Sequence, residues 1–253
     1  MNRIFVFLPA FNEEENIDSL VYAWLDEQRN LEAMGYSLTI HPIDDCSTDS
    51  TKQRMNALAE SHPQVVPLFH EVNKNLGGGV DTALFTFCGQ GKNGDLALLM
   101  DADNSQKPLH VTAMIEKHIA TKADCIICSR YQKGAKVIGV PLIRELLSIG
   151  ARWYYTWMLR VKNVRDYTCG YRLYTYDIIR KAYKAYGRQL VEQRGFTCMM
   201  EVLYKLACIG CEFAEVPFTL RYDNKLGESK MKVSNTVLNS FTAAYDLKKH
   251  IGK

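Results

Sequence analysis

The chain has 253 residues, of which 47% are hydrophobic and 23% charged, with a formal net charge of +3. Its length and apolar content suffice for one substantial core, and α/β proteins commonly reach this length as one domain. The net charge is small, and no run of basic residues is interleaved with aromatic residues. We therefore do not expect the protein to bind nucleic acid.

The sequence predicts contact with a membrane surface at most. No apolar run reaches the roughly 18 residues that a spanning helix needs, and Pro9 with the acids after it interrupts the apolar opening stretch, unlike a signal peptide. We therefore expect a cytoplasmic protein, peripheral on the cytoplasmic membrane face.

Eight cysteines include two C-x-x-C pairs, Cys125/Cys128 and Cys208/Cys211, a spacing that can hold zinc. The first pair lies in an apparent buried strand, where residues i and i+3 face opposite sides. We interpret the cysteines as small core residues in a reducing compartment.

The first half of the chain alternates apolar strands with helices. A strand at 3–8 is followed by helix-start chemistry at 9–16, with Asn12 as a plausible N-cap, and then by apolar residues at helical spacing. A second strand at 38–43 leads into Asp, Ser and Thr residues at 44–51, and a third lies near 65–69.

This alternation predicts a doubly wound, mostly parallel sheet. Ligands of such sheets bind at the carboxyl edge of the strands. We expect Pro9, Asp44, Asp45, Asp101 and Asp103 at that edge.

The apolar run 96–100 ends in Asp101 and Asp103. In an extended chain, residues i and i+2 point to the same side, so both carboxylates can face one divalent cation such as Mg²⁺ or Mn²⁺. Ser105 could add an oxygen or hold a water. The alternative is a polar strand end that caps a helix beginning near Pro108.

Three glycines, Gly77 to Gly79, lack the G-x-G-x-x-G spacing of a nicotinamide-binding fold. Either they let the backbone approach a nucleotide or they form a turn.

Four motifs in order resemble those of family 2 glycosyltransferases: PAFNEE at 9–14, DDCSTDST at 44–51, NLGGG at 75–79 and MDAD at 100–103. In the second half, CSRY at 128–131, DYTCGYR at 166–172 and Arg221 followed by GESK at 227–230 continue the likeness. The chain looks closest to the dolichyl-phosphate (polyprenyl-phosphate) mannosyltransferase branch. The resemblance implies a GT-A catalytic domain at 1–232 and a C-terminal amphipathic helix at 233–253.

The resemblance also implies roles for individual residues. Those expected to bind the nucleotide sugar are Pro9, Ala10, Asn12, Glu13, Asp44, Asp45, Gly78, Asp101, Ala102, Asp103, Arg221 and Lys230. Asp103, Arg130 and Arg221 are expected to act in catalysis, and Arg130, Arg144 and Ser148 to bind the acceptor phosphate. Asp101, Asp103 and Ser105 are the expected ligands of Mg²⁺ or Mn²⁺.

The implied reaction moves mannose or glucose from GDP-mannose or UDP-glucose to a polyprenyl phosphate, with inversion. A lipid phosphate is already an anionic nucleophile near neutral pH and needs no strong base. A hydroxyl acceptor would need one, and Glu201 is the acid best placed by sequence, the alternative being that it faces solvent on its helix. A family 2 enzyme with a sugar, lipid-headgroup or protein hydroxyl acceptor, and a catalytically silent nucleotide-sugar-binding subunit, remain as alternatives.

Two segments suit a membrane or a partner. Residues 149–160 combine Trp153 and Trp157 with tyrosines and arginines, which suits a membrane interface but also a core-facing helix. A last helix near 234–251 could be an interfacial anchor, bind a membrane-anchoring subunit or pack back on the domain.

Overall fold

The computed structural model describes residues 1–140, 142–221, 242–249 and 251, with only the backbone of 142–146. Within these ranges, a seven-stranded sheet has the order β3-β2-β1-β4-β7-β5-β8. Its strands are β1 (Asn2–Ala10), β2 (Tyr36–Asp44), β3 (Leu68–Phe69), β4 (Leu96–Leu99), β7 (Arg172–Thr175), β5 (Cys125–Ser129) and β8 (Phe213–Pro217). All neighbours run parallel except β7, which is antiparallel to both β4 and β5. The predicted mostly parallel α/β fold is confirmed.

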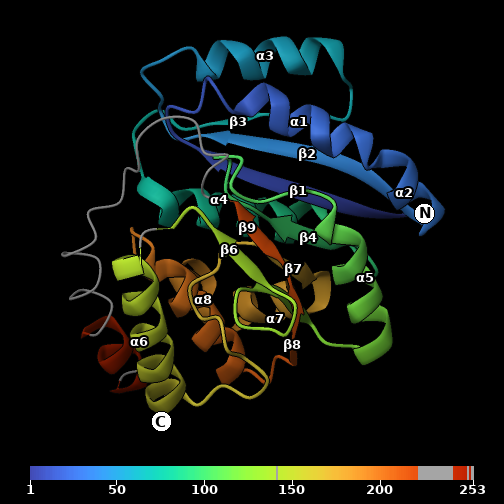
Figure 1. Ribbon diagram of the computed structural model, residues 1–253. Helices are drawn as coiled ribbons and strands as arrows, with labels where there is room; N and C mark the ends of the chain where they lie inside the picture. Colours follow the sequence, from blue (N-terminus) through green and yellow to red (C-terminus); the bar gives the residue numbers. More distant parts are fainter. Residues whose placement is uncertain (141, 222–241, 250, 252–253) are drawn as a thin grey trace.

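Helices flank the sheet on both sides (Figure 1). Helices α1 and α3 pack together at β2, whereas α4, α7 and α8 pack together, with α4 against β1 and β4. The helices are α1 (Ile17–Asp26), α2 (Gln28–Ala33), α3 (Thr51–Ser61), α4 (Asn75–Gln90), α5 (His110–Thr121), α6 (Leu142–Leu159), α7 (Tyr176–Tyr186) and α8 (Thr197–Cys208), with a short 3₁₀ turn, η1 (Gly187–Leu190).

A second sheet pairs β6 (Lys136–Ile138) with β9 (Thr219–Arg221) in parallel. It brings the segment after β5 beside the segment after β8, although more than 80 residues separate them in sequence. Figure 1 shows β6 and β9 side by side.

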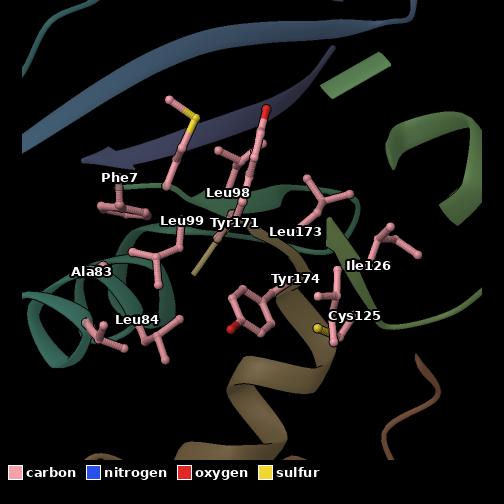
Figure 2. Packing of buried hydrophobic residues seen from close by; sticks show 14 of the residues in the cluster. Phe7, Ala83, Leu84, Leu98, Leu99, Cys125, Ile126, Tyr171, Leu173 and Tyr174 are labelled. Carbon is pink, nitrogen blue, oxygen red and sulfur yellow. The ribbon is translucent and has the colours of Figure 1, made fainter. Parts of the chain in front are cut away.

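The core fills the space between the sheet and its helices. Figure 2 shows Leu84 of α4 packed near Leu99 of β4, with Tyr174 of β7 alongside. The exposed fractions of these three side chains are 3% or less. Strands β4 and β5 are buried at every residue and form nearly continuous apolar runs, as buried central strands do, whereas β7 carries the buried Arg172 between them.

The helix start after β1 differs from the sequence prediction. Helix α1 begins at Ile17 with Asn16 as its N-cap residue, so Asn12 is not the N-cap. Instead, Asn12 has a left-handed φ of 54°, a conformation that asparagine tolerates better than most residues. This frees its side chain to accept a hydrogen bond from the backbone amide of Thr48 at 2.8 Å.

The cysteines follow the core interpretation in part. Cys125 and Cys128 are buried in β5, as expected, and Cys211 is buried before β8. Cys208 is exposed at the end of α8, so the interpretation is wrong at this position. The amphipathic helix turns its last residue outward there.

The described part of the C-terminal helix packs on the domain. Residues 242–249 are helical, and Ala243, Ala244 and Leu247 belong to the hydrophobic core, while Tyr245 is exposed. Packing back on the domain is therefore correct for this part. The predicted start at 234 and the domain boundary at 232/233 lie outside the described residues.

Candidate active site

The strand register brings the predicted polar residues to one edge of the sheet. Ala10 is paired with Asp44 across β1 and β2, and the amide of Asp45 donates to the carbonyl of Ala10 at 2.9 Å. On the other side of β1, the amide of Met100 donates to the carbonyl of Phe7 at 3.1 Å. Pro9, Ala10, Asp44 and Asp45 thus lie beside the start of the Asp101 to Ser105 loop.

The loops after β1 and β2 are bound to each other. The amide of Asn12 donates to Ser47 Oγ at 2.9 Å, and the amide of Glu13 donates to Thr51 Oγ1 at 2.8 Å. The Glu13 carboxylate accepts from the Asn16 side chain at 2.7 Å. Asn12 and Glu13 therefore shape this edge through the loop that follows Asp45.

Asp44 and Asp45 are both buried but serve different neighbours. Asp44 accepts from the amide of Ser47 at 3.2 Å. Asp45 contacts His70 Nδ1 at 2.7 Å and accepts from the amide of Lys74 at 2.8 Å. Asp45 thereby joins β2 to the segment between β3 and α4.

His70 was missed by the sequence analysis. Its Nε2 lies 2.8 Å from Thr82 Oγ1 of α4, so the ring bridges Asp45 and that helix. The sequence does contain a pattern that could have identified His70. It directly follows the third strand, and polar residues also follow the first two strands at the same edge of the sheet.

The Asp101 to Ser105 loop leaves the sheet earlier than predicted. Strand β4 ends at Leu99, so the argument from extended backbone does not apply to Asp101 and Asp103. Asp101 accepts from Gln106 Nε2 at 2.9 Å, and Asp103 accepts from Ser105 Oγ at 2.6 Å. Ser105 is buried and orients Asp103; its role as a metal ligand stays a prediction.

The chemistry of this loop fits a hard divalent cation. Asp101 and Asp103 are half-buried carboxylates on one short loop, and oxygen ligands are those that Mg²⁺ and Mn²⁺ prefer. Next to Asp101, the buried Gln106 Oε1 has no hydrogen-bond partner among the described residues. Within the same ranges, no three His, Cys, Asp or Glu side chains form a complete metal site. Further ligands would have to come from a diphosphate and water, a common arrangement for Mg²⁺.

The glycine run forms the start of α4 and is no turn. A Cβ atom on Gly77 would lie 2.0 Å from the carbonyl oxygen of Gln193, and one on Gly79 would lie 2.9 Å from Pro9 Cβ. A Cβ on Gly78 would meet the Lys74 side chain at 2.1 Å. Glycine is therefore required at 77 and 79 by close protein contacts, and nucleotide binding by Gly78 stays a prediction.

Arg130 is held by a buried carboxylate. Its guanidinium contacts both oxygens of Asp166, at 2.7 and 2.8 Å, and donates to Thr168 Oγ1 at 2.7 Å. Burial alone would raise the pKa of Asp166, but the charge and hydrogen bonds of Arg130 outweigh it and hold that pKa below its ordinary value. The Arg130 side chain remains 20% exposed, so a fixed cation reaches the surface here.

Tyr131 connects Arg130 to α6. Its hydroxyl lies 2.8 Å from Ser148 Oγ, and its ring lies 4.7 Å from the guanidinium carbon of Arg152. Burial raises the pKa of the Tyr131 hydroxyl, which therefore stays protonated as a hydrogen-bond donor. Two of the residues predicted to bind the acceptor phosphate, Arg130 and Ser148, are thus brought together.

The sequence analysis gave Tyr131 and Arg152 no role in the site, although Tyr131 belongs to the CSRY motif at 128–131 and Arg152 to the aromatic segment 149–160. Arg144 lies in α6, but its side chain is not described, and Lys230 lies outside the described residues. Both assignments stay predictions.

Arg221 reaches the site through the small sheet. It ends β9, and its amide donates to the carbonyl of Ser105 at 2.9 Å. This bond places Arg221 beside the loop of Asp101 and Asp103, where Ala102 is buried. The roles of Arg221 in nucleotide-sugar binding and in catalysis stay predictions.

Glu201 does not face the site as a general base. Its carboxylate is 1% exposed and contacts Lys205 Nζ at 2.8 Å and the amides of Glu192 and Gln193 at 3.0 and 2.8 Å. The hypothesis that it either deprotonates a hydroxyl acceptor or faces solvent is not supported by these contacts. It is a buried, paired carboxylate.

Comparisons with known proteins give the family of the chain. Residues 5–186 match the family model described as "Glycosyl transferase family 2". The chain is 29% identical over 240 residues to an undecaprenyl-phosphate mannosyltransferase of Micrococcus luteus, covering 94% of this chain and 92% of that one. It is 28% identical over 252 residues to a dolichol-phosphate mannosyltransferase of Pyrococcus furiosus, covering 99% of this chain and 65% of that one.

Solved structures support the fold. A glucosyl-3-phosphoglycerate synthase from Mycobacterium tuberculosis, in complex with Mn²⁺, UDP and glucosyl-3-phosphoglycerate, superposes with a TM-score of 0.67 at 15% identity. The match covers 99% of this chain and 80% of that one. The predicted resemblance to polyprenyl-phosphate mannosyltransferases and the GT-A-like architecture are both confirmed. The chain is an enzyme of glycosyl transferase family 2.

Proposed function

We propose that the protein transfers a hexose, mannose or glucose, from a nucleotide sugar such as GDP-mannose or UDP-glucose to a polyprenyl phosphate of the dolichyl type, at a membrane surface. The observation that carries the proposal is that Arg221 lies beside the loop of Asp101 and Asp103, while the fixed cation Arg130 follows β5, whose end is level with that of β4 across β7. Such a site has groups for two phosphates, one leaving and one attacking.

Asp101 and Asp103 would hold Mg²⁺ or Mn²⁺, and the chemistry that such an ion supplies is stabilisation of the charge on a departing diphosphate. Asp44 and the loop of Asn12 and Glu13 would line the nucleotide. Arg221, tied to Ser105, would add a planar cation that matches phosphate oxygens.

The acceptor side favours an anionic nucleophile. Arg130 is oriented by Asp166, and Ser148 is oriented by Tyr131, so a cation and a hydroxyl donor could hold one phosphate. Glu201 is engaged elsewhere, which weighs against a hydroxyl acceptor. A phosphate oxygen would attack the anomeric carbon while the bond from that carbon to the diphosphate breaks, which inverts its configuration.

An exposed apolar face supports action at a membrane. In α6, Trp153 and Trp157 are 66% and 65% exposed, whereas Tyr155 and Leu159 on the opposite side are buried. The helix thus uses one side for the core and offers indole rings, which suit the bilayer interface, on the other. No helix in the described ranges is long and apolar enough to span a bilayer. An additional membrane-anchoring subunit stays a prediction.

The test is a transfer assay with labelled GDP-mannose or UDP-glucose, a polyprenyl phosphate and Mn²⁺ or Mg²⁺. Label should enter the organic phase and should depend on both the lipid phosphate and the cation. Transfer to a water-soluble or protein hydroxyl acceptor instead would contradict the proposed acceptor. Tight donor binding without transfer to any acceptor would indicate a catalytically silent subunit.

A thermal-shift measurement can identify the donor nucleotide sugar before the transfer assay. A ligand that binds the folded state raises the melting temperature by mass action. GDP-, UDP- and CDP-sugars should be compared with and without Mn²⁺, and the true donor should give the largest metal-dependent shift.

A further inference from the structure

A buried ion pair in α8 contacts a segment outside the residues assigned above. Glu201 and Lys205, one helical turn apart, are 1% and 2% exposed, and their charged atoms lie 2.8 Å apart. Lys205 Nζ also contacts Glu192 Oε2 at 2.8 Å and donates to the carbonyl of Gln189. The amides of Glu192 and Gln193 donate to Glu201. The hydrogen bonds and ion pairs that the two charged groups make outside α8 thus go to residues 189–193, and Lys205 Nζ also lies 5.9 Å from the centre of the Tyr186 ring.

Burying two charges is unfavourable unless other hydrogen bonds compensate for the lost hydration, so such a pair is a weak source of stability. A better documented role of a buried ion pair is to fix the conformation of the segments around it. Here the neighbour is the connection between η1 and α8, residues 191–196, which forms no helix or strand.

This connection is locked against the first turn of α4. The carbonyl of Arg194 accepts from the amide of Gly77 at 2.8 Å. A Cβ atom on Gly77 would lie 2.0 Å from the Gln193 carbonyl oxygen and 2.9 Å from Arg194 Cα, so only glycine permits the approach. The same turn of α4 abuts Pro9 at Gly79 and follows Lys74, whose amide binds Asp45.

The other end of the connection leads to the carboxylate loop. Helix α8 begins at Thr197, and the carbonyl of Met199 accepts from the buried Arg172 at 2.7 Å. Arg172 also holds the carbonyls of Tyr167 and Cys169. The next residue, Gly170, lies so close to Asp101 that a Cβ atom there would be 3.1 Å from Asp101 Oδ1. Residues 191–196 therefore run between the Asp45 side and the Asp101 side of the sheet edge.

We infer that Glu201 is a positioning residue, which through the amides of Glu192 and Gln193 holds residues 191–196 against the start of α4 and so sets the wall of the donor site between Asp45 and Asp101, while Lys205 balances its buried charge. The donor site itself rests on the proposed function. The positioning of the wall does not depend on which nucleotide sugar binds there.

The test compares Glu201→Gln with the double variant Glu201→Gln/Lys205→Met. Glutamine has one carbonyl oxygen where glutamate has two, so it cannot accept from both Lys205 and the two backbone amides. Removing the ammonium group lets the single oxygen stay with the amides. The single variant should lower kcat/KM about 10- to 100-fold, mainly through the donor KM, and the double variant should recover most of this loss. Glu116→Gln, at an exposed acid of α5, is the matched control and should behave as the wild type.

A second measurement needs no substrate. Hydrogen exchange of the Gly77 amide, followed by NMR, should be at least tenfold faster in Glu201→Gln than in the wild type and should slow again in the double variant. The result stands even if the transfer assay finds no activity, so failure of the proposed function and failure of this inference are distinguishable.

The pH profile separates positioning from proton transfer. A positioning role leaves the shape of the kcat profile unchanged in Glu201→Gln, whereas a general base would lose its acidic limb and would not be rescued by Lys205→Met. Wild-type exchange at Gly77 together with a wild-type donor KM in Glu201→Gln would overturn the inference.

Discussion

The two sides of the proposed site, one for the donor and one for the acceptor, are built by different means. The donor side, formed by residues 9–13, 44–45 and 101–105, is positioned chiefly by backbone, since β2 and β4 flank β1 in parallel register. The acceptor side, formed by Arg130, Tyr131, Ser148 and Arg152, is positioned by side chains that join segments far apart in sequence. The donor side should therefore tolerate side-chain changes structurally and lose only chemistry, whereas the acceptor side should lose structure as well.

The largest expected effect is on donor-side chemistry. Asp103→Asn removes a carboxylate from the loop but keeps an acceptor for Ser105, so turnover should fall more than about 100-fold while the melting temperature stays near that of the wild type. Transfer assays at saturating Mn²⁺ and thermal unfolding measure the two quantities. Asp177→Asn, at an exposed acid of α7, serves as control. Unchanged turnover would remove Asp103 from the metal site.

On the acceptor side, Asp166→Asn should damage structure and binding together. It leaves Arg130 without its buried partner, and breaking such a pair costs about 3 kcal/mol of unfolding free energy. The KM for the lipid phosphate should rise about tenfold, with the donor KM unchanged. Asp18→Asn, which breaks the exposed pair with Arg54, should cost less than about 1 kcal/mol. A donor KM that rises in Asp166→Asn as much as the acceptor KM would remove the distinction between the two sides.

Low pH should destabilise strand β2, which supports the donor side, through protonation of His41. His41 of β2 is buried beside Phe5 and Phe7, and burial lowers its pKa to about 4. Since the unfolded chain binds this proton near pH 6.5 and the folded chain only near pH 4, stability falls as the pH drops between these values, by up to about 3 kcal/mol.

His41→Gln, which does not titrate, should lose less unfolding free energy between pH 7 and pH 4 than the wild type. Denaturant unfolding at both pH values gives the difference, in which the contributions of other groups cancel. After division by the intrinsic exchange rates at each pH, the protection factors of the β1 and β2 amides should fall at low pH before those of the amides around Tyr131. Identical pH dependence in both proteins would contradict the assignment to His41.

The smallest effect on the enzyme itself is expected from the exposed face of α6. Trp153→Ala with Trp157→Ala should leave the fold and the turnover of a short, water-soluble acceptor unchanged, because both rings point away from the core. Binding to anionic phospholipid vesicles should weaken about tenfold in a sedimentation assay. Tyr22→Ala, at an exposed ring on α1, should bind as the wild type does. Equal vesicle binding by both would show that α6 is not the membrane-facing element.

The sequence predicts the donor side better than the acceptor side for the same physical reason. Polar residues directly after parallel strands must meet at one edge, so Asp44 and Asp101 could be placed from the alternation of strands and helices alone. The pairing of Arg130 with Asp166 spans 36 residues and depends on tertiary packing, so no local pattern reports it.

Other differences arise where side-chain contacts override a local pattern. Asn12 has the residue type of an N-cap but binds the neighbouring loop, and the glycine run is dictated by contacts with Gln193 and Pro9. Glu201 has the residue type of a base, but Lys205 one turn later in the same helix engages it. The antiparallel insertion of β7 between β4 and β5 has no local signature either.

That insertion governs how the sheet can assemble during synthesis. Strand β4 gains its second neighbour only when residues 172–175 emerge, more than 70 residues after β4 itself. Until then, the apolar edge Leu96–Leu99 has backbone groups ready to pair with another chain, which is the usual origin of aggregation in nascent sheets. Fragments that end before β7 should therefore be poorly soluble, and the order in which this chain leaves the ribosome makes chaperone protection most valuable between β4 and β7.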